Sequence, residues 1–210
     1  MLLALSILCL VSAIVTLINA DQKNNLFMVF KPLTTVLIIL IALNAGISGS
    51  YALAILTALI ASLFGDVFLL FESKFILGLV SFLIAHIFYI KAFYSGFSGF
   101  GLLFFALPLL LYAVIMLRLL WPGLGRLKLP VLVYISAILL MAYQAAEVYY
   151  HSHSLSAIFA LVGALLFTFS DSALALNKFR KPFNNAQLII LSSYYLAQWL
   201  IALSLYRFGG

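Results

Sequence analysis

Two aspartates, Asp66 and Asp171, stand inside otherwise apolar segments of this sequence. Both occur in the pattern aromatic, small, Asp, x, x, Leu, over residues 64–69 and 169–174. A carboxylate is costly to bury in hydrocarbon, and burial favours the protonated form of the acid. Because a general acid must carry a proton, the matched pair predicts proton-transfer chemistry.

A structural role for each acid is the alternative. Ser62 precedes Asp66 by one turn, and Thr168 lies a similar distance before Asp171. Each carboxylate could therefore hydrogen-bond a neighbouring hydroxyl or cap a helix. A matched pair favours chemistry more strongly than a lone intramembrane acid would.

Other polar side chains occur in two further apolar segments. His86 and Tyr89 are three residues apart, so they share a helix face, as do Tyr195 and Gln198, with Tyr194 beside them. These groups could line a polar cavity together with the two acids. Alternatively, His86 and Gln198 form hydrogen bonds between helices as packing contacts.

Lys31, Glu147 and the pair His151 and His153 each allow a functional and a structural interpretation. Lys31 could meet a phosphate at the cytoplasmic surface as a point charge, or it is an ordinary basic residue of a cytoplasmic boundary. Glu147 lies toward the outer end of its segment, which favours an interfacial residue over a third site acid. A His-x-His without nearby acids or cysteines is a weak metal signal, so we predict no metal and no cofactor.

The composition indicates an integral membrane protein. Of the 210 residues, 67% are hydrophobic and 8% are charged, whereas about 25% are charged in an average soluble protein. The excess of eleven basic over five acidic residues indicates cytoplasmic loops and lipid head groups rather than nucleic acid. Cys9 is the only cysteine, which excludes a disulfide within the chain.

Apolar runs close to the roughly 20 residues that cross a bilayer predict an all-α fold with eight transmembrane helices in one domain, residues 1–210. The predicted helices are 2–19, 32–45, 51–71, 75–94, 101–120, 130–149, 155–176 and 185–206. The second is long enough if residues 26–30 extend it, with Pro32 in or near its first turn. The first is predicted to be a retained span, because no basic segment precedes it and Ala20 ends a poor cleavage site. The connections carry the turn residues Gly46, Gly49, Gly96, Gly99, Pro122, Gly123, Gly125 and Asn184.

Basic residues predict the orientation in the membrane. The odd-numbered connections hold Lys23, Lys31, Lys74, Arg118, Arg126, Lys128, Lys178, Arg180 and Lys181, whereas the even-numbered ones and the C-terminal tail hold only Lys91 and Arg207. Since cytoplasmic loops are enriched in Lys and Arg, both termini are predicted on the non-cytoplasmic side. Each aspartate then lies five residues before the cytoplasmic end of its helix, about 8 Å deep at roughly 1.5 Å per residue.

The positions of the acids also suggest an internal repeat. Asp66 and Asp171 are half a chain length apart, and Lys74-Phe75 and Lys178-Phe179 follow them at similar distances. Four helices in each half would form a 4+4 parallel repeat. Chance agreement among abundant Phe and Leu residues is the other interpretation.

Five motifs occur in order along the chain. They are Phe30-Lys31-Pro32-Leu33, Phe64-Gly65-Asp66, the stretch from Gly78-Leu79 through Phe82-Leu83-Ile84-Ala85-His86 to Tyr89, the stretch from Leu166-Phe167 to Ser170-Asp171, and Tyr194-Tyr195-Leu196-Ala197-Gln198. Together they resemble the YhhN/TMEM86 family of lysoplasmalogenases. The resemblance implies an eight-helix membrane hydrolase that cleaves the vinyl ether bond of lysoplasmalogens, releasing a fatty aldehyde and glycerophosphoethanolamine or glycerophosphocholine.

The resemblance also implies roles for individual residues. Hydrolysis of a vinyl ether begins with protonation of an alkene carbon, so one of Asp66 and Asp171 is expected to donate the proton. The other is expected to stabilise the oxocarbenium ion and direct water onto it, as in glycoside hydrolysis; which acid donates stays open. The expected substrate-binding residues are Lys31, His86, Tyr89, Ser170, Tyr194, Tyr195 and Gln198. The expected partners are the lysophospholipid, water and membrane lipids, with the site toward the cytoplasmic leaflet.

Two other functions are compatible with buried acids. A proton-coupled transporter or channel also uses intramembrane carboxylates, although no predicted span is clearly broken by a Pro or Gly pair in its middle. A membrane scaffold without a site would use both aspartates for stability alone. The sequence carries no signal for an oligomeric state.

Overall fold

The computed structural model of the chain describes residues 1–94 and 103–206. Within these ranges the chain forms helices and turns, with no strand. The helices are α1 (Leu2–Ile18), α2 (Asn25–Asn44), α3 (Gly49–Phe68), α4 (Phe75–Phe93), α5 (Leu103–Leu120), α6 (Lys128–Ser152), α7 (Leu155–Ala175) and α8 (Ala186–Leu203). Short 3-10 turns precede α4 (η1, Glu72–Lys74) and link α5 to α6 (η3, Trp121–Gly123; η4, Gly125–Leu127), and a π-helical turn follows α7 (η5, Leu176–Arg180).

The eight predicted helices are confirmed. Seven of them are long and apolar enough to cross a membrane, and α1 is a shorter apolar helix. The predicted turn residues Gly96 and Gly99, the first residues of the predicted fifth helix and Arg207 lie outside the described residues.

The predicted start of the second helix is wrong in one respect. The extension to residue 26 is correct, because α2 begins at Asn25, where the Asn24 side chain accepts a hydrogen bond from the Phe27 backbone N–H at 3.1 Å. Asparagine is a favoured N-cap residue. Pro32 therefore lies inside α2 rather than in its first turn, and Lys31 lies in the second turn.

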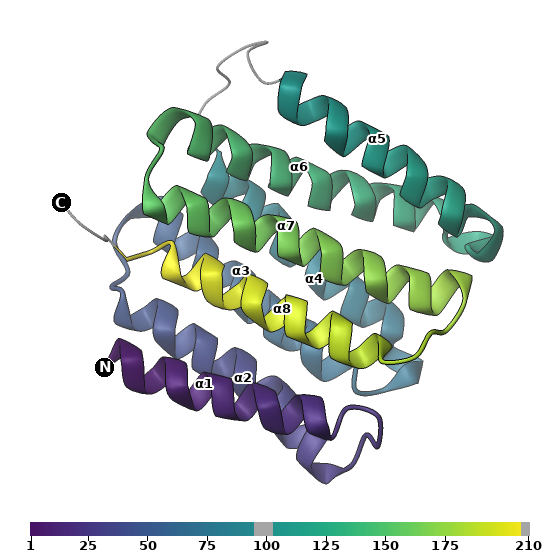
Figure 1. Cartoon of the computed structure of the whole chain (residues 1–210), viewed down its shortest axis with the longest axis horizontal. Helices are drawn as coiled ribbons and strands as arrows, with labels where there is room; N and C mark the ends of the chain where they lie inside the picture. The colour runs from purple at the N-terminus through teal and green to yellow at the C-terminus, as the bar shows by residue number, and fades with distance from the viewer. Residues whose placement is uncertain (95–102, 207–210) are drawn as a thin grey trace.

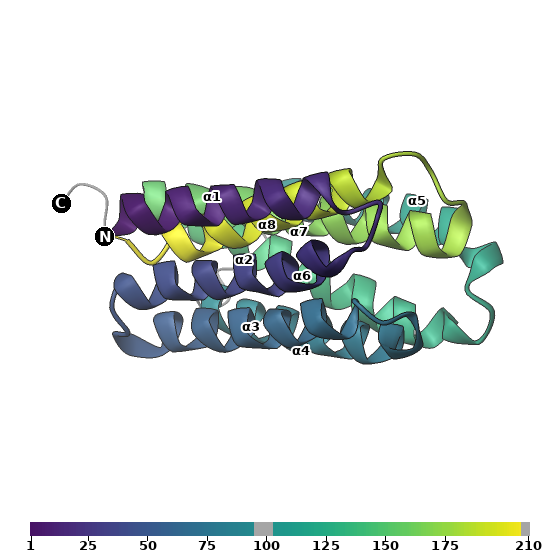
Figure 2. The same cartoon turned by 90° about the horizontal axis from the view of Figure 1, so that it is seen from below.

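Six helices form a closed ring around the core. In order of contact they are α2, α3, α4, α6, α7 and α8, and α8 packs back against α2. α1 packs outside the ring on α2 and α8, and α5 packs on α6. Figure 2 shows α1, α8 and α7 in one layer and α3 with α4 in the layer beneath them.

The two halves of the chain use corresponding contacts. The close hairpin of α3 and α4 corresponds to that of α7 and α8, and the contact of α4 with α6 corresponds to that of α8 with α2. Likewise, α1 packs on α2 as α5 packs on α6. These correspondences support the parallel repeat, which stays a prediction.

The start of α1 and the end of α8 lie at the same end of the bundle (Figures 1 and 2). The connections from α1 to α2, α3 to α4, α5 to α6 and α7 to α8 lie at the opposite end, which carries most of the basic residues. We call it the basic end. Lys31 is an exception to the prediction for these residues, because it is buried within α2 rather than placed in a connection.

Small residues allow the two close hairpins to form. A Cβ atom on Gly65 of α3 would lie 2.6 Å from the ring of Phe82 on α4. On the other hairpin, a Cβ on Gly163 would lie 2.7 Å from Ile201 Cγ1 and 2.9 Å from the Ala197 carbonyl oxygen. Close approach of helix backbones at small residues is a common source of stability in membrane proteins.

Replacing Gly163 by Ala should therefore destabilise the bundle, because the backbone carbonyl of Ala197 can move only if α8 moves. We expect a loss of about 1–3 kcal/mol, the usual cost of overpacking, measured as a lower midpoint of thermal unfolding in detergent. Val162→Ala is the control, since the neighbouring Val162 is exposed on the outside of α7. Equal midpoints for the two variants would contradict the proposed close packing.

Candidate active site

Asp66 and Asp171 meet at one cavity near the basic end, which we call the polar pocket. It has a volume of about 170 Å³ and lies among α2, α3, α4, α7 and α8. The expected site residues that line it with the acids are Lys31, Ser170 and Tyr194. The structure thus brings together five side chains from α2, α3, α7 and α8.

The expectation that both acids lie five residues before the end of a helix is wrong. α3 ends at Phe68, only two residues after Asp66, because the chain turns there toward η1. α7 ends four residues after Asp171 and continues into the π-helical turn η5. The acids still line the same pocket.

Asp66 is held by hydroxyl groups from two other helices. Its Oδ2 accepts hydrogen bonds from Thr35 Oγ1 on α2 at 2.6 Å and from Tyr194 Oη on α8 at 2.7 Å. Only 1% of the residue is exposed. Lys31, which lies 5% exposed on α2, lines the same pocket as this carboxylate. Two donors and a nearby ammonium group are surroundings that stabilise a carboxylate.

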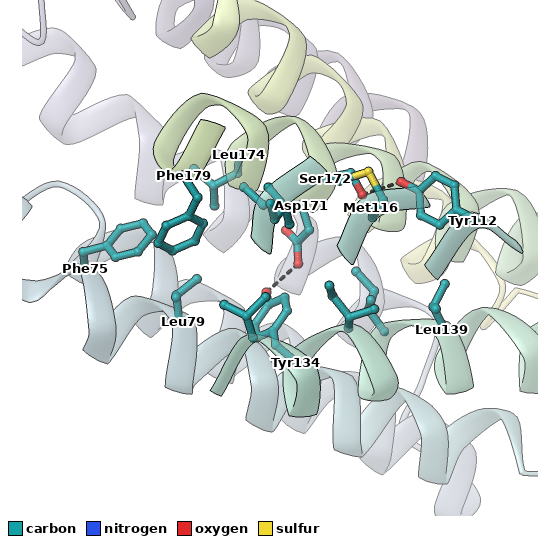
Figure 3. A pocket seen from close by; sticks show the side chains of 15 residues that line it. Phe75, Leu79, Tyr112, Met116, Tyr134, Leu139, Asp171, Ser172, Leu174 and Phe179 are labelled. Carbon is teal, nitrogen blue, oxygen red and sulfur yellow. Dashed lines mark hydrogen bonds between the residues drawn. The ribbon is translucent and has the colours of Figure 1, made fainter. Parts of the chain in front are cut away.

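Asp171 has different neighbours. Its Oδ2 accepts a hydrogen bond from the hydroxyl of Tyr134 on α6 (Figure 3). The same oxygen lies 3.7 Å from His86 Nε2, beyond hydrogen-bond distance. The His86 ring is fully buried, edge-on to Tyr134 and Phe167, and within the described residues neither of its nitrogens has a hydrogen-bond partner.

A second cavity begins at Asp171, and we call it the apolar cavity. It has a volume of about 50 Å³ and lies among α4, α5, α6 and α7 (Figure 3). Most of its lining is hydrocarbon, from residues such as Leu79, Met116 and Ile138. Asp171 lines both cavities, whereas Asp66 lines only the polar pocket. Asp171 therefore stands where an apolar space meets a polar one.

The remaining expected site residues lie behind the polar pocket. The hydroxyl of Tyr89 donates to Gln198 Oε1 in the buried core. Tyr195 donates to the Lys31 carbonyl oxygen at 3.3 Å and lines a separate groove beside α1. Together with His86, these side chains support the pocket but do not line it.

Sequence reasoning missed Tyr134 and Thr35, although each donates a hydrogen bond to one of the acids. Tyr134 lies outside the five motifs, and tyrosine is common in membrane helices. Thr35 lies one turn after Lys31 on the same face of α2. That spacing was the signal that could have identified Thr35.

Glu147 is buried rather than interfacial, and its Oε1 accepts a hydrogen bond from Tyr143 at 3.2 Å. It lies near the end of α6, away from the basic end. His151 and His153 are exposed close by. In the described part of the chain, no three His, Cys, Asp or Glu side chains gather as metal ligands would.

Comparison with known proteins identifies the family. Residues 26–205 match the YhhN family. The chain belongs to this family. This confirms the resemblance seen in the five motifs, which supply the lining or support of the polar pocket from α2, α3, α4, α7 and α8.

Individual relatives cover most of the chain. The chain is 30% identical over 181 residues to the uncharacterized membrane protein YhhN of Escherichia coli O157:H7, covering 85% of this chain and 86% of the relative. It is 35% identical over 193 residues to lysoplasmalogenase TMEM86B of Sus scrofa, and the match covers 82% of this chain and 71% of the relative. The lysoplasmalogenase TMEM86B of Homo sapiens is 36% identical over 182 residues, and the match covers 76% of this chain and 66% of the relative. No solved structure matches the chain significantly. Apolar helices and relatives named as membrane proteins together identify an integral, multi-pass membrane protein.

The surroundings of Asp66 predict energetic coupling with Lys31. Asp66→Asn should lower the free energy of unfolding by about 1–3 kcal/mol, because it leaves a buried ammonium group without its carboxylate. Lys31→Met should likewise destabilise the protein, and the double variant should lose clearly less than the sum of the single losses. Denaturant unfolding of the three variants measures this coupling. Strictly additive losses would show that the two charges do not interact.

Proposed function

We propose that this chain is a lysoplasmalogenase, an enzyme that hydrolyses the vinyl ether bond of a lysoplasmalogen. The products would be a fatty aldehyde and glycerophosphoethanolamine or glycerophosphocholine. The observation that carries the proposal is the position of Asp171 at the junction of the apolar cavity and a polar pocket that holds a second carboxylate, Asp66. The names of the TMEM86B relatives support the same reaction.

The two cavities match the two parts of this substrate. The first carbons of the hydrocarbon chain would occupy the apolar cavity of about 50 Å³, and the glycerophospho group would occupy the polar pocket. The vinyl ether links these two parts, so it would lie beside Asp171. Lys31 reaches into the polar pocket and would hold the phosphate as a point charge.

This placement assigns different roles to the two acids. The carbon that must be protonated carries the hydrocarbon chain, so it lies on the apolar side of the ether oxygen. Asp171 is the acid on that side, and in its protonated form it donates the proton while the alkene electron pair forms the new C–H bond. The neighbouring carbon then shares the positive charge of an oxocarbenium ion with the ether oxygen.

Asp66 completes the reaction from the polar pocket. Its carboxylate stabilises the oxocarbenium ion and accepts a proton from the water that attacks the cationic carbon. The resulting hemiacetal collapses to the aldehyde and the glycerol hydroxyl. Proton transfer from Asp66 through water to Asp171 restores both acids. No nucleophilic side chain is required by this sequence of steps.

Tyr134 is a positioning residue in this mechanism. Its hydroxyl donates to one oxygen of Asp171, so the proton of the protonated acid resides on the other oxygen. His86, packed edge-on to Tyr134, restricts the tyrosine ring. The site would face the cytoplasmic leaflet, since basic residues gather at that end of the bundle.

Purified protein in detergent should release aldehyde from a lysoplasmalogen and none from the saturated-ether analogue, because only the vinyl ether can be protonated at carbon. Asp66→Asn and Asp171→Asn should each lower kcat by about 10²–10⁴-fold. Their pH profiles should differ, because a donor must be protonated and a base ionised. The wild-type profile should be bell-shaped, Asp171→Asn should lose the alkaline limb and Asp66→Asn the acidic limb.

Unchanged aldehyde release by the double variant Asp66→Asn, Asp171→Asn would exclude this mechanism. Exchange of the two limbs between the single variants would reverse the assigned roles. Proton-gradient-dependent uptake into proteoliposomes without aldehyde release would favour the transporter alternative.

The apolar cavity makes a separate prediction about chain length. Leu79→Trp should fill part of the cavity and raise KM about tenfold for a substrate with a long alkenyl chain, with little effect on a short-chain analogue. Leu83→Trp is the matched control, because Leu83 lies one turn further along α4 and lines only an outer groove. Equal effects of the two variants on both substrates would show that the chain binds elsewhere.

A further inference from the structure

The polar pocket continues outward from the two acids to a mouth of opposite charges. Lys178 of η5, Lys23 of the α1–α2 connection and Glu72 of η1 line this mouth. Lys23 Nζ lies 3.5 Å from Glu72 Oε1, and the two side chains are 56% and 86% exposed. An exposed ion pair of this kind contributes little stability, so a ligand can replace either partner.

A second polar recess adjoins the mouth. Lys23, Asn177 and Gln187 line both the polar pocket and this recess, where Asp21 joins them. Lys23 is therefore shared by two cavities, with Glu72 beside one and Asp21 beside the other. The side-chain oxygens of Asn177 and Gln187 add hydrogen-bond acceptors to the lining of both cavities.

The charges change sign along the path out of the site. Lys31 is deepest, and no hydrogen bond from its ammonium group to another described residue is found, although the side chain is 5% exposed and lines the pocket. Lys23, with a side chain 56% exposed, comes next, and Glu72, with a side chain 86% exposed, lies further out. An anion followed by a cation on one flexible ligand would match this order.

We propose that the mouth is a head-group subsite for a phosphodiester that carries a primary ammonium group, an inference that rests on the proposed function. The phosphate lies against Lys31 and Lys23. The ammonium group takes the place of Lys23 beside Glu72, and Lys23 turns to the phosphate. A primary ammonium group donates three hydrogen bonds to Glu72 and the amide oxygens, whereas a trimethylammonium group has no N–H to donate.

Three substrates with the same alkenyl chain test this subsite, with phosphoethanolamine, phosphocholine or a bare phosphate as the head group. The wild-type protein should show its highest kcat/KM with the ethanolamine substrate. Glu72→Gln should lower kcat/KM for that substrate about tenfold, mainly through KM. The same variant should raise kcat/KM for the bare phosphate about twofold, because a carboxylate that repels the phosphate is removed.

Lys74→Gln is the matched control. Lys74 lies on the same 3-10 turn as Glu72, but its ammonium group lies 5.2 Å from the Phe71 ring centroid and lines neither cavity. The ratio of kcat/KM values between the ethanolamine and bare-phosphate substrates should be unchanged in this variant. Asp21→Asn should shift the ratio in the same direction as Glu72→Gln.

Two results would overturn the subsite separately from the proposed function. Glu72→Gln could lower kcat/KM for all three substrates by the same factor, or the wild type could prefer choline to ethanolamine. In both cases aldehyde release would still support the proposed lysoplasmalogenase activity. Absence of aldehyde from all three substrates with the wild-type protein would instead overturn the proposed function and the subsite with it.

Discussion

The structure depends on keeping two carboxylates inside a bundle that is otherwise apolar. An acid placed there without partners would cost several kcal/mol. Each acid has a partner on another helix: Thr35 and Tyr194 donate to Asp66, and Tyr134 donates to Asp171. The donors to Asp66 come from α2 and α8, the two helices whose contact closes the ring. Packing of α8 against α2 therefore closes the ring and also brings together the two hydroxyl groups that donate to Asp66.

The small residues of the two close hairpins serve this requirement. Gly65 precedes Asp66 directly and lets α3 approach the Phe82 ring on α4. Gly163 brings α7 against Ala197 of α8, on the helix that also carries Tyr194. A hydroxyl donor must reach its acceptor within about 3 Å, so helices held apart by larger side chains could not supply these hydrogen bonds.

The sequence alone predicts the helices and the two buried acids, but not most of the side chains that donate hydrogen bonds to the acids. The bilayer thickness sets the length of a long apolar run, so the run can be recognised from one stretch of sequence. A charged residue inside the run can be recognised in the same way. Partners depend on which helices meet, and a hydrophobic pattern does not encode the closure of a ring. Tyr134 resembled any other membrane tyrosine for this reason. The sequence predicts Lys31 at the cytoplasmic surface, but α2 begins at Asn25, so the lysine lies in its second turn and is buried.

The distribution of cavities favours a site reached from one side over a transport path. The lining residues of the polar pocket and the apolar cavity come from the half of the bundle nearer the basic end. Further along the bundle, Tyr89 and Gln198 are fully buried, and the Tyr89 ring stacks on Phe93 and packs edge-on to Phe167. A transporter needs a second opening to the same binding site, whereas a hydrolase needs only one entrance for lipid and water. A lysolipid also enters from the membrane surface, so a site open at one end can bind substrate and release both products.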